Sequence, residues 1–259
     1  MKYLIYRFME NSDYIFGIHS AIEAIEAGRT VDKLLIKKDL NGELAIRLIH
    51  LAKDYGIPVL RVPVEKLNRI TRKNHQGVIG FMSAVAYYSL EDILPAMFED
   101  GVLPFLLVLD GITDVRNFGA IARTAECCGV NAIVIPQRGS VTVGADAVKT
   151  SAGALLHIPV CRVASLPQAV QYIKDSGCQI VCATEKASEN YTLGDYTTPL
   201  ALVMGAEDTG ISPEVLRKAD TRSAIPMFGK IGSLNVGVAA GVMMYEVVRQ
   251  RLEGNLEII

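Results

Sequence analysis

Five almost purely apolar runs constrain the fold of this chain most strongly. From position 104 onward the sequence contains, in order, FLLVLD, AIVIP, IPVCRV, QIVCAT and ALVMG, and segments with helical patterning separate them. A strand with one solvated face alternates polar and apolar residues, whereas a strand buried on both faces is apolar throughout. We therefore predict an α/β fold with a mostly parallel sheet and helices on both faces.

A shorter, more regular pattern precedes these runs. Helix-like segments (IHSAIEAIEAG, GELAIRLIHLAKDYG, VEKLNRIT) alternate with strand-like segments (VDKLLIKK, IPVLRVP, HQGVIGFMSAV). This alternation predicts a small α/β domain over residues 14–88. The acidic, weakly periodic stretch SLEDILPAMFEDG follows, so we predict a linker over 89–103 and a second domain over 104–259.

Residues 1–13 are predicted to be a short extension. Arg7 and Glu10 interrupt its apolar stretch and no small-residue cleavage site follows, which argues against a signal peptide. No apolar run has the length that a membrane span needs. The five cysteines show neither a CxxC pair nor a Cys/His ligand spacing, which predicts reduced, buried thiols and no metal site. We expect a cytoplasmic protein without a membrane partner.

The small net charge of −2 hides an asymmetry, because residues 1–90 carry 13 Lys and Arg against 9 Asp and Glu. The densest basic stretch consists of Arg61, Lys66, Arg69, Arg72, Lys73 and His75, opposed by Glu65. Such a patch is the electrostatic signature of a nucleic-acid binder, and Arg61, Arg69, Arg72 and Lys73 are the candidate RNA contacts. From charge alone a solvated helix face is the simpler interpretation, because the stretch lacks aromatic residues for base stacking.

Three polar segments, 117–123, 205–212 and 225–235, each follow an expected strand. The carboxyl ends of parallel strands are where open α/β sheets bind ligands, so we expect the segments to meet and to form an enzyme site. Taken singly, their residues have structural explanations. Asn117 is expected to cap the helix that carries Arg123, and Arg123 with Glu126 is expected to form at most a weak surface ion pair.

The other two segments carry Glu207, Ser233 and Asn235. Glu207 lies just after ALVMG in a turn between Gly205 and Gly210, where it can meet a ligand or an arginine. Ser233 or Asn235 is expected to cap the last helix, whose free N–H groups can bind an anion or a polar ligand edge. The glycines here match neither a P-loop nor a GxGxxG fingerprint. These absences argue against a nucleotide- or dinucleotide-binding enzyme.

Three motifs together resemble a known family. NFGAIARTAECCGV, LVMGAEDTGIS and IPMFGKIGSLNVGVAAGVMMYE resemble the SpoU/TrmH branch of the SPOUT RNA 2'-O-ribose methyltransferases, and the resemblance covers residues 104–250. FGIHSAIEAI and HQGVIGF resemble the ribosomal-protein-like substrate-binding domain of the RlmB-like 23S rRNA guanosine methyltransferase subgroup. The resemblance implies a deep trefoil knot that binds S-adenosylmethionine, with Gly205, Ile225 and Leu234 lining the cofactor site. It also implies a homodimer with the helix 236–252 in its interface.

The implied reaction is methyl transfer to a ribose 2'-hydroxyl, which needs positioning and a base but no metal. The family's catalytic positions correspond here to Asn117, Arg123, Glu207, Ser233 and Asn235. Arg123 is either the base or a bidentate clamp on an RNA phosphate, and a guanidinium is ordinarily too strongly protonated to act as a base. The implied substrate is a guanosine of 23S rRNA. The alternatives are a tRNA 2'-O-methyltransferase and a non-catalytic RNA-binding homologue.

Overall fold

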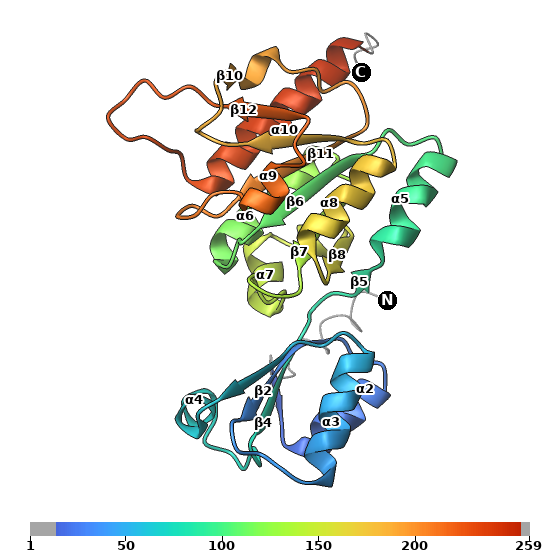
Figure 1. Ribbon diagram of the computed structural model, residues 1–259, viewed down its shortest axis with the longest axis vertical. Coiled ribbons are helices and arrows are strands. Elements are labelled where there is room, and N and C mark those ends of the chain that lie inside the picture. Colours follow the sequence, from blue (N-terminus) through green and yellow to red (C-terminus); the bar gives the residue numbers. More distant parts are fainter. Residues whose placement is uncertain (1–13, 255–259) are drawn as a thin grey trace. The chain divides into compact units, whose positions relative to one another are not determined.

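The computed structural model describes residues 14–254, which form two compact units (Figure 1). The first unit comprises the described residues up to Ala86 together with Thr142–Asp146. The second unit comprises Tyr87–Val141 and the described residues from Ala147 onward. The extension predicted over 1–13 lies outside the described residues.

The first unit is a sheet with the strand order β1-β4-β2-β3. Its strands are β1 (Tyr14–Phe16), β2 (Val31–Lys37), β3 (Val59–Val62) and β4 (Val78–Met82). Its helices are α2 (Ile18–Glu26), α3 (Glu43–Asp54) and α4 (Val64–Ile70). Alternate side chains of β2 enter two separate cores, because Leu34 packs with residues of α2 and α3 whereas Leu35 packs with Leu67 of α4. The predicted order of helices and strands in this region is confirmed.

The second unit contains a sheet with the strand order β10-β12-β9-β11-β6-β7-β8-β5, and every neighbouring pair is parallel. The strands are β5 (Tyr87–Tyr88), β6 (Phe105–Asp110), β7 (Ala132–Pro136), β8 (Val160–Val163), β9 (Gln179–Ala183), β10 (Glu189–Asn190), β11 (Leu200–Gly205) and β12 (Thr221–Ala224). All five apolar runs form strands, which confirms the predicted parallel sheet. The short, polar strand β12 is not an apolar run, so the sequence pattern did not reveal it.

Helices lie on both faces of this sheet (Figure 1). They are α5 (Leu90–Glu99), α6 (Val115–Cys127), α8 (Leu166–Asp175), α9 (Pro213–Leu216) and α10 (Val236–Gly254). The short helix α7 (Ala145–Thr150) spans the division between the two units. Side chains of α5, α8 and α9 share one core with alternate residues of the strands. Helix α10 packs against α6 and β11.

The linker predicted over 89–103 is wrong for most of its length, because it forms α5. Ser89 caps this helix by accepting a hydrogen bond from the Asp92 backbone N–H at 3.1 Å. Leu90 and Leu94 are fully buried in the core of the second unit. The acidic residues and Pro95, which lies inside the helix, obscured its short apolar face. The first boundary between the units along the chain falls between Ala86 and Tyr87.

The cysteines are only partly as predicted, since Cys127 is exposed at the end of α6. Cys161, Cys178 and Cys182 are buried, and burial raises the pKa of Cys161 and of Cys182 to about 12. All five are free thiols. In the described part of the chain no group of three or more His, Cys, Asp or Glu is arranged to hold a metal ion. None of the helices within residues 14–254 is long and apolar enough to cross a membrane.

Two helical glycines should respond oppositely to alanine. A Cβ on Gly119 of α6 would lie 2.6 Å from Thr150 Cβ and 3.0 Å from the Ser151 backbone nitrogen. We expect Gly119→Ala to lower the free energy of unfolding by about 1–3 kcal/mol through overpacking.

A Cβ on Gly241 of α10 would lie 3.7 Å from Thr124, which is an ordinary contact. Gly241→Ala should therefore raise the free energy of unfolding by up to ~1 kcal/mol. Urea unfolding followed by circular dichroism tests both, and destabilisation by both variants would contradict the steric argument.

Candidate functional site

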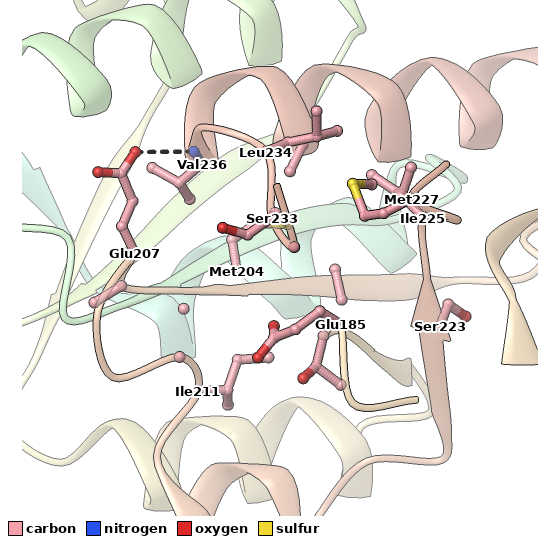
Figure 2. Close-up of a pocket in the computed structure, with 17 residues that line it drawn as sticks. Glu185, Met204, Glu207, Ile211, Ser223, Ile225, Met227, Ser233, Leu234 and Val236 are labelled. Atoms are coloured by element: carbon pink, nitrogen blue, oxygen red, sulfur yellow. Dashed lines mark hydrogen bonds between the residues drawn. The ribbon is translucent and has the colours of Figure 1, made fainter. Parts of the chain in front are cut away.

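The strands that precede the three predicted segments end at one edge of the sheet. Strands β6, β11 and β12 are parallel, with β11 next to β6 and β9 between β11 and β12. A pocket opens at this edge within the second unit (Figure 2). Gly205, Ile225 and Leu234, the predicted cofactor-binding residues, all line it, as do Glu207 and Ser233. Its apolar wall also includes Met204, Ile211 and Met227.

Gly205 is required by a close approach of two backbone segments. A Cβ at this position would lie 2.2 Å from the carbonyl carbon of Gly210 and 2.3 Å from the backbone nitrogen of Ile211. The loop folds back through a hydrogen bond from Gly210 N–H to Ala206 O at 2.8 Å. The Ser212 N–H donates to Asp110 Oδ2 at 2.8 Å, which ties the loop to the end of β6. The loop that carries Glu207 is therefore held tightly against β11.

Asn117, Glu207 and Asn235 form one hydrogen-bonded cluster although they lie far apart in the sequence. The Asn235 amide Nδ2 donates to Asn117 Oδ1 at 3.0 Å and to Glu207 Oε1 at 2.5 Å. The Val236 backbone N–H donates to the same Glu207 oxygen at 3.1 Å (Figure 2). A carboxylate at the N-terminus of α10 also interacts favourably with the helix dipole.

Asn235 has a second, structural role. Its Oδ1 accepts a hydrogen bond from Gly237 N–H at 3.0 Å, so Asn235, rather than Ser233, caps α10. The predicted cap at Asn117 is wrong, because Asp114 caps α6. Asp114 Oδ1 accepts from the backbone N–H groups of Arg116 and Asn117, both at 2.9 Å. Asn117 thus lies inside the first turn of α6, where its side chain reaches Asn235.

Arg123 is exposed on α6, next to Thr124, which lies near Gly241 of α10. Within residues 14–254 no ion pair joins it to Glu126, and it is not part of the cluster formed by Asn117, Glu207 and Asn235. Ser233 and Leu234 belong to the long loop between β12 and α10 (Figure 1). Phe228 and Ile231 of this loop are 98% and 78% exposed.

Sequence reasoning missed Glu185. This residue follows β9 and lines the pocket, into which its side chain points in Figure 2. Glu207 was singled out because it lies just after the apolar run ALVMG. Glu185 lies just after the apolar run QIVCAT, so the same sequence pattern could have identified it. The pocket therefore presents two carboxylates, and only that of Glu207 is held by the N-terminus of α10.

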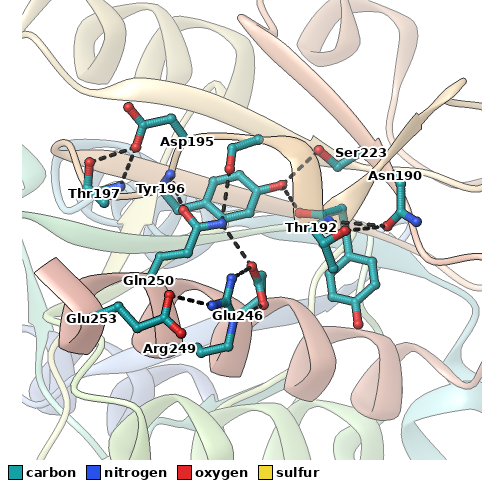
Figure 3. A network of polar contacts seen from close by, with 12 residues as sticks. Asn190, Thr192, Asp195, Tyr196, Thr197, Ser223, Glu246, Arg249, Gln250 and Glu253 are labelled. Carbon is teal, nitrogen blue, oxygen red and sulfur yellow. Dashed lines mark hydrogen bonds and ion pairs between the residues drawn. The ribbon is translucent and has the colours of Figure 1, made fainter.

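A polar network connects the region of β12 with the C-terminal half of α10 (Figure 3), and its member Ser223 also lines the pocket. The hydroxyl of the fully buried Tyr196 donates to Tyr191 O at 2.8 Å, so the Ser223 hydroxyl on β12 donates to Tyr196 across 2.9 Å. Gln250 of α10 accepts from Tyr196 N–H at 2.8 Å and donates to Glu246 Oε1 at 2.8 Å. Hydrogen bonds from Arg249 hold the pKa of Glu246 below its ordinary value.

The basic residues predicted to bind RNA lie in the first unit and divide between two places. Arg69, Arg72 and Lys73 are exposed at and after the end of α4. Arg61 pairs with Ile36 in the β2–β3 register, and Ile36 packs in the core with α2 and α3, so Arg61 lies on that face of the sheet. Its Nη1 donates a hydrogen bond to Lys38 O at 2.8 Å. His75 is buried, and both of its ring nitrogens have partners within the unit. Its Nδ1 accepts a hydrogen bond from Gly77 N–H at 3.0 Å, and its Nε2 lies 2.9 Å from Asn68 Oδ1.

Comparison with known proteins adds to this geometry. Residues 104–245 match the model of the SpoU rRNA Methylase family, and residues 14–88 match one described as RNA 2'-O ribose methyltransferase substrate binding. The putative TrmH family tRNA/rRNA methyltransferase YacO from Bacillus subtilis is 38% identical over 242 residues, which are 93% of this chain and 97% of that protein. The AdoMet-bound rRNA methyltransferase from Sinorhizobium meliloti is similar in structure, with a TM-score of 0.58 and 27% identity over 94% of this chain and 89% of that chain. The A. aeolicus TrmH/SpoU tRNA modifying enzyme has a TM-score of 0.54 and 32% identity, covering 64% of this chain and 86% of that chain.

Proposed function

Because the chain belongs to the SpoU rRNA methylase family, we propose that it methylates a ribose 2'-hydroxyl of structured RNA, with a guanosine of 23S rRNA as its substrate. The observation that carries this proposal is the cluster of Asn117, Glu207 and Asn235 beside the pocket. Three segments far apart in the chain converge there on one polar site. A merely structural use of each residue would not require that convergence.

The cofactor is S-adenosylmethionine, and the pocket fits its chemistry. Apolar side chains such as Met204, Ile225 and Leu234 suit the faces of an adenine ring, and the strand ends offer backbone groups to its polar edge. Gly205 and Gly210 both line the pocket, and the close approach of their backbone segments leaves no room for a Cβ at Gly205. When bound, the cofactor supplies a methyl group on a sulfonium centre. The sulfur becomes a neutral thioether as the methyl group is transferred, so the leaving group needs no metal. Gly205, Ile225 and Leu234 are the residues proposed to hold it.

We also propose that the end of the second unit forms a trefoil knot around this pocket. The strand order supports this proposal, because β11 lies between β6 and β9 while the following strand β12 lies on the other side of β9. Helix α10 then returns to pack against β11 and α6. The loops after β11 and after β12 both border the pocket, as a knotted cofactor site would require.

The site residues are proposed to position the ribose and to stabilise its hydroxyl as it attacks. Glu207 already accepts two hydrogen bonds, so its role is to orient Asn235 rather than to remove a proton. Arg123, with its planar guanidinium, is proposed to clamp the phosphate next to the target ribose, while a phosphate oxygen or water accepts the proton. Ser233 is proposed to contact the same hydroxyl from the loop after β12.

The choice of rRNA over tRNA rests on coverage. The Sinorhizobium meliloti rRNA methyltransferase aligns with 94% of this chain, whereas the tRNA modifying enzyme aligns with 64%.

The proposed function is tested by transfer of tritiated methyl groups from S-adenosylmethionine to purified 23S rRNA and to tRNA, followed by mapping of the modified nucleotide. RNA from a strain lacking the gene should lose the same 2'-O-methyl group. Labelling of tRNA alone, or of neither RNA, would support one of the two alternative functions.

A homodimer is proposed through α10. Val238, Tyr245 and Leu252 are 54%, 55% and 64% exposed and recur at intervals of seven residues, so they form one apolar stripe on this helix. We expect Val238→Asp with Tyr245→Glu to convert a dimer into a monomer in sedimentation equilibrium. Phe98→Glu is the matched control, because Phe98 is 40% exposed on α5, a helix that packs in the core shared with α8 and α9. A monomeric wild-type protein would contradict the proposal.

A further inference from the structure

Three aromatic side chains gather on one face of the sheet in the first unit. Tyr14 and Phe16 come from β1 and Phe81 from β4, and all three are partly buried. Tyr14 lies opposite Phe81 in the β1–β4 register, and the ring centroids of Tyr14 and Phe16 are 6.5 Å apart. These rings, brought together by strand pairing, form what we call the aromatic face.

Two lysines lie over these rings. Lys33 is the register partner of Phe81 on β2, and its Nζ lies 4.9 Å from the centroid of the Phe81 ring. Lys73 Nζ lies 5.5 Å from the centroid of Phe16. Lys73 belongs to the exposed turn after α4 that also carries Arg72. Two ammonium groups therefore border the aromatic face.

The two faces of the sheet differ in how they are covered. Helices α2 and α3 cover the face that bears Leu34 and Ile36. Helix α4 has only seven residues, and through Leu67 it packs on the other face near Leu35, Val62 and Ile79. The aromatic rings lie at the margin of that smaller core, where they stay partly exposed beside ammonium groups.

We propose that the aromatic face binds unpaired bases of the RNA substrate, an inference that rests on the proposed function. Flat rings stack on any base, and neighbouring cations neutralise the phosphates, which is how proteins bind single-stranded nucleic acid. An incoming base takes the place of an ammonium group over a ring, and that ammonium pairs with the phosphate of the same nucleotide. The preferred substrate is therefore a loop or other unpaired segment rather than a continuous duplex.

The test measures binding of full-length protein to a fluorescein-labelled RNA hairpin with an unpaired loop, and to a blunt duplex with the same stem. Phe16→Leu with Phe81→Leu should weaken hairpin binding about 10-fold and leave duplex binding unchanged. Tyr55→Leu is the control, since Tyr55 is a 59% exposed aromatic residue at the end of α3. Lys33→Gln with Lys73→Gln should instead flatten the salt dependence, by a slope of about 0.7 for each lost phosphate contact.

Photocrosslinking of the wild-type protein to a hairpin with 5-iodouridine in its loop tests the same face without substitution. The expected adducts are on the peptides that contain Phe16 or Phe81. Wild-type hairpin affinity in the folded Phe16→Leu, Phe81→Leu variant, or adducts only elsewhere, would overturn the inference. A changed oligomeric state with unchanged RNA affinity would also overturn it, by making the face a protein interface. Methyl transfer by the wild-type protein is assayed separately, so failure of the proposed function is distinguishable from failure of this inference.

Discussion

Gly205→Ala is expected to abolish binding of S-adenosylmethionine while the protein stays folded. The added Cβ would lie 2.2 Å and 2.3 Å from backbone atoms of Gly210 and Ile211, and backbone cannot rotate away as a side chain can. The loop that carries Glu207 must therefore shift away from β11. Because the shifted loop no longer presents Gly205 and Glu207 to the cofactor, titration calorimetry should detect no binding.

The matched control for this experiment is Gly144→Ala. A Cβ there would meet nothing within 4 Å, and Gly144 lies outside the pocket. Circular dichroism should remain native for both variants. Wild-type affinity in Gly205→Ala would mean that the loop relaxes without consequence and that the cofactor site lies elsewhere.

Arg123→Ala is expected to lower the turnover number about 100-fold or more, with an unchanged dissociation constant for S-adenosylmethionine. This split follows from the position of Arg123, which is exposed on α6 and does not line the pocket. A residue that contacts only the RNA acts on the transition state without holding the cofactor. Single-turnover methylation with saturating RNA is the decisive measurement.

Arg123→Lys separates a clamp from a simple positive charge. Lysine keeps the charge but loses the planar fork that binds two phosphate oxygens at once. If Arg123 clamps a phosphate, Arg123→Lys should stay close to Arg123→Ala in rate. Arg217→Ala is the control, since Arg217 is exposed after α9 and away from the site. Near-full activity of Arg123→Lys would exclude the bidentate clamp.

Structural elements that follow from local sequence patterns were predictable from the sequence. Strands such as β6 and β11 are buried on both faces, so their apolar runs reveal both their existence and the parallel sheet. Because parallel strands end at one edge, the sequence also placed Gly205, Glu207 and Ile225 around one pocket. Helix α5 was missed, because Pro95 and acidic residues break the periodicity that reveals a helix.

Contacts between distant segments were decided by the tertiary structure alone. Asn117, Glu207 and Asn235 each have a local structural explanation, and only the packing of α10 against α6 and β11 joins them by hydrogen bonds. The basic stretch that begins in β3 contains no aromatic residue, yet the fold brings Phe16 and Phe81 from other segments next to Lys73 and Lys33. Periodicity depends on the nearest neighbours of a residue in the chain, so the sequence determined the five apolar strands, their parallel arrangement and the edge that bears the site. Side-chain partners depend on register and helix packing, which exist only once the chain has folded.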